Sequence, residues 1–377
     1  MPTLFGRDLP RRELARRVGD VSQLLGVELL EHVDGQERGV RALRFRTGGG
    51  LAFDLMVDRA MDVGAMELHG VPLGWRSPTG FRSPWLHEHD AEEGLGWLRS
   101  FSGLVSTCGL DHVMGPVEED AGHYGYPYRK RVHHGLHGRV AYTPARLLGY
   151  GVRWEGERCL LWAEGEIRQA TMFGEFLVLT RRVEAEAGGT TVTVRDTVEN
   201  RGFRPTPHAM LYHVNVGFPV VDEGARLVAP LVRTRHHVHD PKATDVGALE
   251  QTAPRAGFVE QVYEHEVAAD AGGTAWAALV NPGFRHPAGA EGLGLRVAWD
   301  ARAMPAFYQW QNLQEGDYVV GLEPATVLPG SREDWKARGE LRFLEHGESV
   351  TYGLELTPVL GREAIGALTT AATMLNP

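Results

Sequence analysis

Short runs of β-branched or alternating apolar and polar residues, separated by Gly, Pro, Asn and Asp, make up most of this sequence. Runs and breaks of this kind are typical of strands joined by turns. Strands are therefore predicted at residues 39–46, 51–57, 158–166, 176–184, 190–199, 210–218, 275–280, 293–299, 318–322 and 349–356. So many short strands indicate two packed sheets rather than one open sheet.

The order of the predicted elements also limits the fold. Strands do not alternate regularly with helices, so a doubly wound parallel fold is disfavoured. The 47 glycines and 21 prolines supply the many turns that a sandwich needs. We therefore expect an all-β protein: one large, mostly antiparallel β-sandwich domain over residues 1–377. Residues 1–30 would form an N-terminal arm that is helical over about residues 11–25.

Two stretches lack the strand pattern. Residues 70–120 are rich in Gly, Trp, Pro and His, and residues 236–254 are polar and irregular. Long loops on a rigid β scaffold are often where binding residues lie. We expect ligand contacts from these two stretches.

Composition excludes several partners. The net charge of −10 would repel nucleic acid and anionic membranes. No apolar run approaches the ~18–20 residues of a spanning helix, and no signal-peptide pattern is present. The two cysteines, Cys108 and Cys159, have no spacing typical of a disulfide framework or a zinc site. These features predict a cytoplasmic protein with neither a nucleic-acid nor a membrane partner.

The predicted strand at 210–218 separates two kinds of chemistry. Because side chains alternate along a strand, His213 and Asn215 share one face, while the opposite face is apolar throughout. An imidazole beside an amide on such a strand indicates a face that lines a ligand groove. The alternative is a partly buried histidine without a catalytic task.

A second polar position ends the predicted strand at 318–322. Glu323 follows an apolar run and shares a face with Gly321. Burial at this position would raise the pKa of the carboxyl towards values useful to a base, and the glycine would leave room for a ligand. The alternative is a strand-end carboxylate that points into water.

Several segments resemble the aldose 1-epimerase (galactose mutarotase-like) superfamily. They are V-E-N-R-G at 198–202, T-P at 206–207, Y-H-V-N at 212–215 and G-L-E-P at 321–324. T-C-G-L-D at 107–111 and H-G-R at 137–139 are similar to an uncharacterised DUF4432-type branch, and the likeness covers about residues 40–360. The spacing from His213 to Asn215 is shorter than the H-x-Y-F-N of that superfamily.

The resemblance implies an aldose 1-epimerase that opens and closes a sugar ring. Glu323 would be the base and His213, as an imidazolium, the acid. His137 and Asn215 would bind sugar hydroxyls. No metal or organic cofactor is implied, and the partner would be a small-molecule sugar.

Other substrate-binding candidates have structural alternatives. Arg139 and Asp111 lie in the two motifs of that branch, although Asp111 could instead cap a turn. Arg59 could bind hydroxyls or pair with Asp62. Trp310 offers a flat surface for stacking on a sugar, or it packs in the core. Glu260 is also similar to a position in the branch, with no role assigned to it.

Metal and nucleotide sites are disfavoured. The histidines form two groups, but neither matches the H-E-x-x-H pattern of a zinc helix. These groups are His133, His134 and His137, and His236, His237 and His239. Phosphate-binding glycine loops and the G-x-S-x-G elbow are absent from the sequence.

Two alternatives to the epimerase stay open at this point. One is a non-catalytic sugar-binding or sensor protein, and the other is an isomerase or lyase that acts on a keto or acidic sugar. The sequence names neither the sugar nor the oligomeric state, and a homo-oligomer is one of the options.

Overall fold

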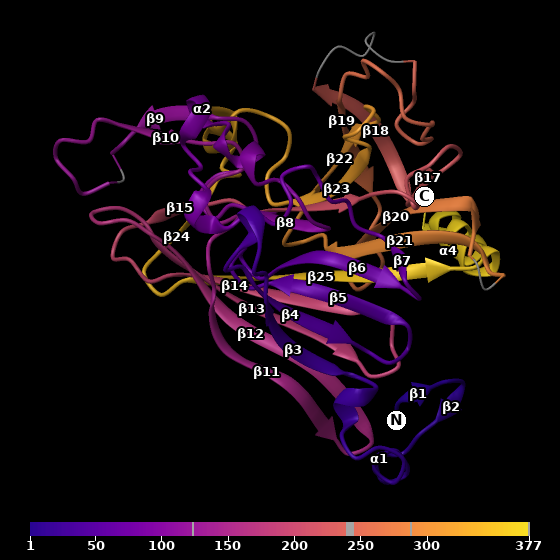
Figure 1. Cartoon of the computed structure of the whole chain (residues 1–377). Helices are drawn as coiled ribbons and strands as arrows, with labels where there is room; N and C mark the ends of the chain where they lie inside the picture. The colour runs from indigo at the N-terminus through magenta and orange to yellow at the C-terminus, as the bar shows by residue number, and fades with distance from the viewer. Residues whose placement is uncertain (123, 239–244, 287–288, 376–377) are drawn as a thin grey trace.

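Strands form three large sheets in the computed structural model, which describes the chain except residues 123, 239–244, 287–288 and 376–377 (Figure 1). The eight-stranded sheet contains, in spatial order, β11 (Arg146–Glu155), β12 (Arg158–Ala170), β13 (Phe176–Glu186), β14 (Val192–Asn200), β25 (Ser349–Leu360), β21 (Glu291–Asp300), β20 (Thr274–Arg285) and β17 (Arg226–Val228).

Two smaller sheets complete the main architecture. The six-stranded sheet contains, in spatial order, β18 (Leu231–Val238), β19 (Gln261–Val267), β22 (Ala306–Asn312), β23 (Val319–Ala325), β16 (Leu211–Val216) and β8 (Val105–Cys108). The five-stranded sheet contains β3 (Gly26–Glu31), β4 (Arg41–Arg46), β5 (Leu51–Met56), β6 (Asp62–Leu68) and β7 (Val71–Pro72).

Short elements connect these sheets. The two-stranded pairs are β1 (Thr3–Leu4) with β2 (Arg7–Asp8), β9 (Val117–Asp120) with β10 (Arg131–His134), and β15 (Thr206–His208) with β24 (Arg342–Leu344). The α-helices are α1 (Arg11–Ala15), α2 (Ala91–Gly94), α3 (Arg332–Arg338) and α4 (Arg362–Leu375). The 3-10 helices are η1 (Val21–Gln23), η2 (Gly35–Glu37), η3 (Pro84–Leu86) and η4 (Gly96–Arg99).

The predicted all-β, mostly antiparallel fold is confirmed. Every strand pair in the described ranges is antiparallel, and parallel pairing occurs there only at two isolated bridges. Each predicted run lies on a strand; for example, the run 190–199 corresponds to β14 and the run 349–356 to β25. No helix in the described part of the chain is both long enough and apolar enough to cross a bilayer.

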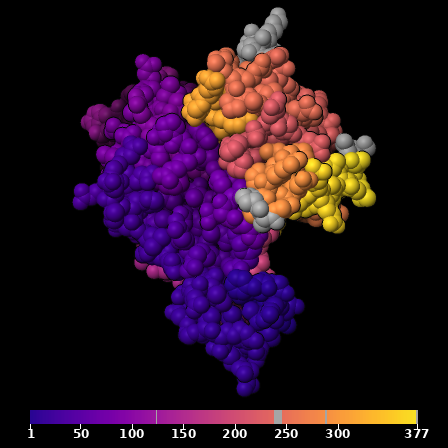
Figure 2. All heavy atoms as spheres, turned by 45° about the vertical axis from the view of Figure 1, so that its right-hand side comes forward, coloured from indigo at the N-terminus to yellow at the C-terminus, as the bar shows by residue number. Residues whose placement is uncertain are grey.

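The N-terminal arm is less helical than expected. Instead of one helix over residues 11–25, the structure has α1 and the separate turn η1. The interruption falls at Asp20, whose carboxylate accepts a hydrogen bond from the backbone N–H of Ser22 and so begins a new turn. At the other end of the chain, α4 packs on the surface against β20, β21 and β25 (Figure 2).

The two stretches expected to be irregular are partly regular. Residues 70–120 contain β7, β8 and β9, and β8 lies at the edge of the six-stranded sheet, paired with β16. In the stretch 236–254, β18 extends to Val238, and residues 239–244 lie outside the described residues. The rest of this second stretch contains no strand among its described residues.

A buried ionic cluster joins the three sheets. Arg181 on β13 donates two hydrogen bonds, of 2.8 and 2.6 Å, to the carboxylate of Asp196 on β14. It also donates to Asp62 on β6 and to Thr107 on β8, at 2.5 and 2.7 Å. Tyr212 on β16 donates to Asp196 at 2.7 Å. Because Arg181 lies between two buried carboxylates, its loss would leave both of them without a cation.

Candidate active site

His213 and Glu323 face each other from neighbouring strands. Strand β16 pairs with β23 so that Leu211 lies opposite Ala325 and Val214 opposite Leu322, which places His213 level with Glu323. Nε2 of His213 is 3.1 Å from Oε1 of Glu323. The two residues that the family resemblance implies as acid and base are therefore close together.

Asn215 fixes the tautomer of His213. The side-chain amide N–H of Asn215 donates to the carbonyl of Gly103 at 3.0 Å, so its Oδ1 is the atom that faces Nδ1 of His213. Since that oxygen only accepts, Nδ1 must carry the ring hydrogen. Nε2 of the neutral ring then presents its lone pair to Glu323.

Burial shifts both pKa values of the pair. Each residue is about 4% exposed. Desolvation, with His137 as a second cause, lowers the pKa of His213 well below its usual 6.5. Desolvation, with the charge of Glu260 second, raises the pKa of Glu323 to about 8. At neutral pH the proton of the resting pair is therefore on Glu323 rather than on His213.

The contact between the two groups is close but poorly aligned. Although the 3.1 Å separation is within ion-pair range, Oε1 of Glu323 has no hydrogen-bond partner among the described residues. Buried polar atoms in folded proteins almost always have such a partner. An unsatisfied carboxyl oxygen beside a free imidazole lone pair is an arrangement that a ligand hydroxyl could complete.

Aromatic rings surround His213. The ring centroids of Trp97 and Phe101 lie 5.9 and 4.9 Å from its imidazole, and those of Trp310 and His137 lie at 5.4 and 5.6 Å. Trp97 is part of η4, and both Trp97 and Phe101 lie in the 70–120 stretch from which ligand contacts were expected. The expected open groove over the pair is not present, because these side chains fill it.

Gly321 has a different role from the predicted one. A Cβ at this position would lie 2.6 Å from Oε1 of Glu323 and 3.0 Å from Cε1 of His213. A side chain here would therefore displace Glu323 and His213 from their present positions. The space beside Gly321 is occupied by the acid–base pair itself rather than left for a ligand.

Glu260 and Trp310 form a second layer behind the pair. Nε1 of Trp310 donates to Oε2 of Glu260 at 2.6 Å. The charge of Glu260 contributes to the raised pKa of Glu323. Glu260 therefore lies within electrostatic range of the predicted base.

Arg139 and Asp111 lie in a cluster of their own. Nη1 of Arg139 is 3.3 Å from Oδ2 of Asp111, and the side-chain amide of Gln169 donates to the other carboxylate oxygen at 2.7 Å. The neighbouring charges of His134 and Arg139 hold the pKa of buried Asp111 at about 2, against the opposing effect of desolvation. Of the predicted substrate-binding residues, His137, Asn215 and Trp310 are gathered at the pair, whereas Arg139 and Asp111 form this separate cluster.

Arg59 anchors the segment that covers the pair. Its guanidinium is buried, donates to the backbone carbonyls of Arg82 and Ser100, and lies over the ring of Tyr142 at 4.3 Å. The predicted ion pair of Arg59 with Asp62 does not form, because Asp62 pairs with Arg181. Arg59 thus fixes both ends of the stretch that carries Trp97.

No three His, Cys, Asp or Glu side chains in the described ranges are placed to hold a metal ion. His134 instead lies between Asp111 and Glu119, 3.5 and 3.0 Å from their carboxylates. His239, a member of the second histidine group, lies outside the described residues.

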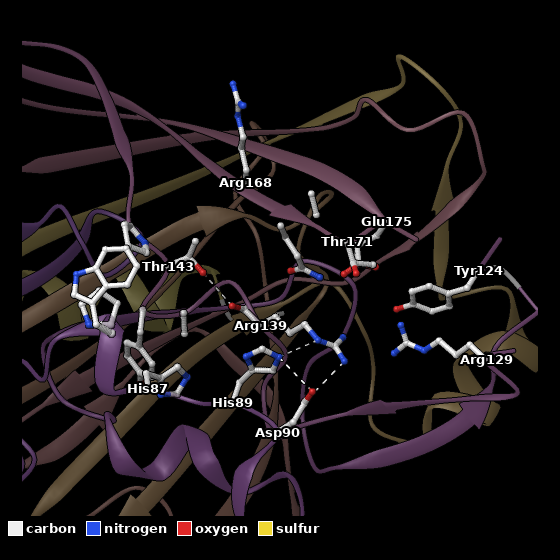
Figure 3. Close-up of a pocket in the computed structure, with 17 residues that line it drawn as sticks. His87, His89, Asp90, Tyr124, Arg129, Arg139, Thr143, Arg168, Thr171 and Glu175 are labelled. Atoms are coloured by element: carbon white, nitrogen blue, oxygen red, sulfur yellow. Dashed lines mark hydrogen bonds and ion pairs between the residues drawn. The ribbon is translucent and has the colours of Figure 1, made fainter. Parts of the chain in front are cut away.

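A polar cavity of about 490 Å³ is lined by residues that include His87, Arg139 and Tyr142 (Figure 3). Neither His213 nor Glu323 lines it. Tyr142 does, and its ring is 6.1 Å from that of Trp97, which in turn contacts His213. A layer made by Tyr142 and Trp97 therefore separates this cavity from the acid–base pair.

Residues 37–357 match the family described as a domain of unknown function, DUF4432. The chain belongs to this family. Among proteins with curated descriptions, none matches the chain significantly.

Solved structures with the same fold include sugar epimerases and their relatives. A proposed aldose 1-epimerase from Klebsiella pneumoniae is similar with a TM-score of 0.83 and 22% identity, over 95% of this chain and 91% of that one. A galactose mutarotase-like protein from Clostridium acetobutylicum has a TM-score of 0.54 and 12% identity, over 88% and 98%. A galactose 1-epimerase from Lactobacillus acidophilus has a TM-score of 0.53 and 12% identity, over 90% and 100%. This DUF4432 protein therefore has a galactose mutarotase-like fold.

Proposed function

We propose that this DUF4432 protein interconverts the anomers of a sugar, the aldose 1-epimerase reaction, with Glu323 and His213 as its acid–base pair. The observation that carries the proposal is the 3.1 Å approach of two ionisable groups whose burial moves their pKa values in opposite directions. Pairs of groups with pKa values shifted by their environment are typical of acid–base catalysis. A fold shared with a galactose 1-epimerase supports it.

The reaction needs one proton acceptor and one proton donor. The acceptor removes the proton of the anomeric hydroxyl while the donor protonates the ring oxygen, so that the bond from C1 to the ring oxygen breaks and an aldehyde forms. Rotation about the bond from C1 to C2, followed by the reverse transfers, closes the ring as the other anomer. A positioned acid or base typically contributes ~10²–10⁴-fold to such a rate.

A pair that holds a single proton can serve in both roles. With Glu323 as base and His213 as acid, the proton must be on the imidazole when the sugar reacts. In the resting protein the proton is on Glu323, so transfer across the 3.1 Å gap converts the resting form into the reactive one. Both forms contain the same number of protons. Asn215 stabilises the imidazolium form as well, because its oxygen accepts the hydrogen on Nδ1 in either form.

A non-catalytic sugar-binding protein is the second candidate. The observation in its favour is that Trp97 and Phe101 cover His213, leaving it and Glu323 about 4% exposed. A catalyst would need these rings to move so that the anomeric carbon reaches the pair, whereas a sensor would not use the pair at all.

Anomer exchange followed by NMR over a panel of aldoses, keto sugars and sugar acids separates the two candidates. Glu323→Gln and His213→Asn should each slow exchange by at least ~10²-fold while changing sugar affinity much less. Glu184→Gln, a surface carboxylate on β13, is the matched control and should exchange at the wild-type rate. If both active-site variants exchange every accepted sugar like the wild type, the acid–base assignment is wrong.

A further inference from the structure

The polar cavity contains two facing guanidinium groups. Figure 3 shows the ends of Arg129 and Arg139 on opposite sides of the same space, with the hydroxyl of Tyr124 and the carboxyl of Glu175 next to it. Burial and then the charges of Glu175 and Asp111 raise the pKa of the Tyr124 hydroxyl, while Arg139 and Arg129 oppose them, so these groups lie within electrostatic range of that hydroxyl. Arg168 also lines the cavity but points away and pairs with Glu166 at 2.6 Å.

The two guanidinium groups differ in how their charges are balanced. Arg139 lies 3.3 Å from Asp111 and 3.8 Å from Asp90, and it also donates to the ring of His89 at 3.1 Å. Arg129 lies over the ring of Tyr124, 4.1 Å from its centroid, and forms no ion pair with a described carboxylate. The space between them therefore has an excess of positive charge at its Arg129 side, where an anionic group would be stabilised.

Two polar atoms on the cavity wall lack hydrogen-bond partners among the described residues. They are Oε2 of Glu175, which is 6% exposed, and Nε2 of His87. Burial, with the charge of Asp111 second, raises the pKa of Glu175, which favours the protonated carboxyl and makes it a hydrogen-bond donor. Buried polar atoms without partners are rare in native proteins, so these two atoms are positions that a ligand hydroxyl or a water molecule can complete.

The segments that line the cavity also carry exposed aromatic rings. Tyr126 and Phe173 stack at 5.7 Å, and Tyr128 is 82% exposed. Tyr126 and Tyr128 lie between Tyr124 and Arg129, while Phe173 lies between Thr171 and Glu175. Trp85, which also lines the cavity, is likewise 82% exposed. Flat apolar rings beside hydrogen-bonding groups are suited to the C–H faces and hydroxyls of a sugar.

We propose that this cavity is a second ligand site, separate from the His213–Glu323 pair, that binds a monosaccharide bearing an anionic group. The anionic group lies between Arg129 and Arg139, and sugar hydroxyls pair with Glu175 and His87. The volume of about 490 Å³ lies within the ~300–1,000 Å³ of typical small-molecule sites. A sugar carboxylate and a sugar phosphate share this chemistry.

Calorimetric titration of the full chain with D-glucuronate, glucose 6-phosphate and D-glucose tests the site. At least one of the two anionic sugars should bind about tenfold or more tightly than glucose, because a charge-assisted hydrogen bond is lost with the neutral sugar. Which one binds identifies the anionic group. Arg129→Gln should remove this preference, and Arg129→Lys should keep part of it, since the charge remains while the forked geometry is lost.

Two controls make the result specific. Arg131→Gln removes an exposed arginine, two residues away, that pairs with Glu118 and does not line the cavity, so it should keep the preference. Glu323→Gln should keep it too, which separates this proposal from the one for the acid–base pair. The proposal is overturned by equal affinity for glucose and the anionic sugars, by unchanged binding in a folded Arg129→Gln, or by acetate or inorganic phosphate binding as tightly as the anionic sugar.

Discussion

Tyr212 and His213 are neighbours on β16, yet their side chains enter two buried polar clusters of different kinds. Tyr212 points to the side where Arg181, Asp196 and Asp62 form an ionic cluster with complete partners. His213 points to the other side, where it meets Glu323 and a carboxyl oxygen is left without a hydrogen bond. Both sides are equally dry, so burial alone does not distinguish them.

The two clusters differ in whether their buried carboxyl groups have a positively charged partner. This difference decides whether a cluster stabilises the fold or can transfer a proton. In the first cluster a guanidinium bridges both carboxylates, and the groups hold three sheets together. In the second cluster no positive charge balances the carboxyl, so burial keeps both groups neutral and their proton is available for transfer. Mutations on the Arg181 side of β16 should therefore mainly lower stability, whereas mutations on the His213 side should mainly change protonation and activity.

The largest expected effect on stability is at Arg181. Arg181→Met leaves Asp196 and Asp62 buried without their cation, and the free energy of unfolding should fall by about 3–5 kcal/mol. Urea denaturation measures it. Arg182→Met is the matched control, since Arg182 is the next residue on β13 and forms partly exposed pairs with Glu164 and Glu184. A loss of at most about 1 kcal/mol is expected there. Equal losses in the two variants would contradict the structural role of the cluster.

The second prediction concerns pH and the pair. A carboxyl whose pKa is raised on folding binds more protons in the folded state, so its contribution to stability is complete below the unfolded pKa and is lost as pH rises through the folded pKa. With the pKa of Glu323 at about 8, stability should fall between about pH 6 and about pH 9, by a contribution on the order of 2 kcal/mol.

Glu323→Gln cannot ionise and should lack this contribution. Urea denaturation of both proteins at the two pH values measures the difference between their pH dependences. Parallel curves for the wild type and the variant would mean that Glu323 is already ionised at the lower pH.

The smallest expected effect is at Tyr212. Tyr212→Phe removes one hydrogen bond to Asp196, but the bidentate contact with Arg181 remains, so the loss should be about 1 kcal/mol. Anomer exchange should be unchanged, because the hydroxyl lies on the opposite side of β16 from His213. A slower exchange in this variant, with stability intact, would show that the two sides of the strand are coupled.

Local sequence pattern predicts one part of this arrangement well. Alternation along β16 correctly places Tyr212 and His213 on opposite faces, and apolar runs locate β16 and β23, which bring His213 and Glu323 together. The family resemblance then selects these two residues among 17 histidines and many carboxylates. The roles of the two residues in catalysis stay a prediction.

Contacts between distant segments are not visible in that pattern. Arg181 reaches Asp62 across 119 residues, and nothing in either strand indicates this pairing. Trp97 and Phe101 lie in a stretch without a periodic pattern, so their position over His213 depends on how Arg59 holds that stretch. Gly321 is another example, because the sequence alone does not show whether the space beside a glycine is empty or filled by neighbouring side chains.

The position of β25 has a consequence for how the protein is made. This strand, residues 349–360, lies between β14 and β21 in the middle of the eight-stranded sheet, so the two halves of the sheet have no shared strand until it arrives. On a ribosome, β11 to β14 therefore wait with an open edge at β14 while more than a hundred further residues are synthesised. Pairings between segments so far apart close slowly, and exposed strand edges attract other chains. The newly made chain is thus exposed to aggregation until β25 is released.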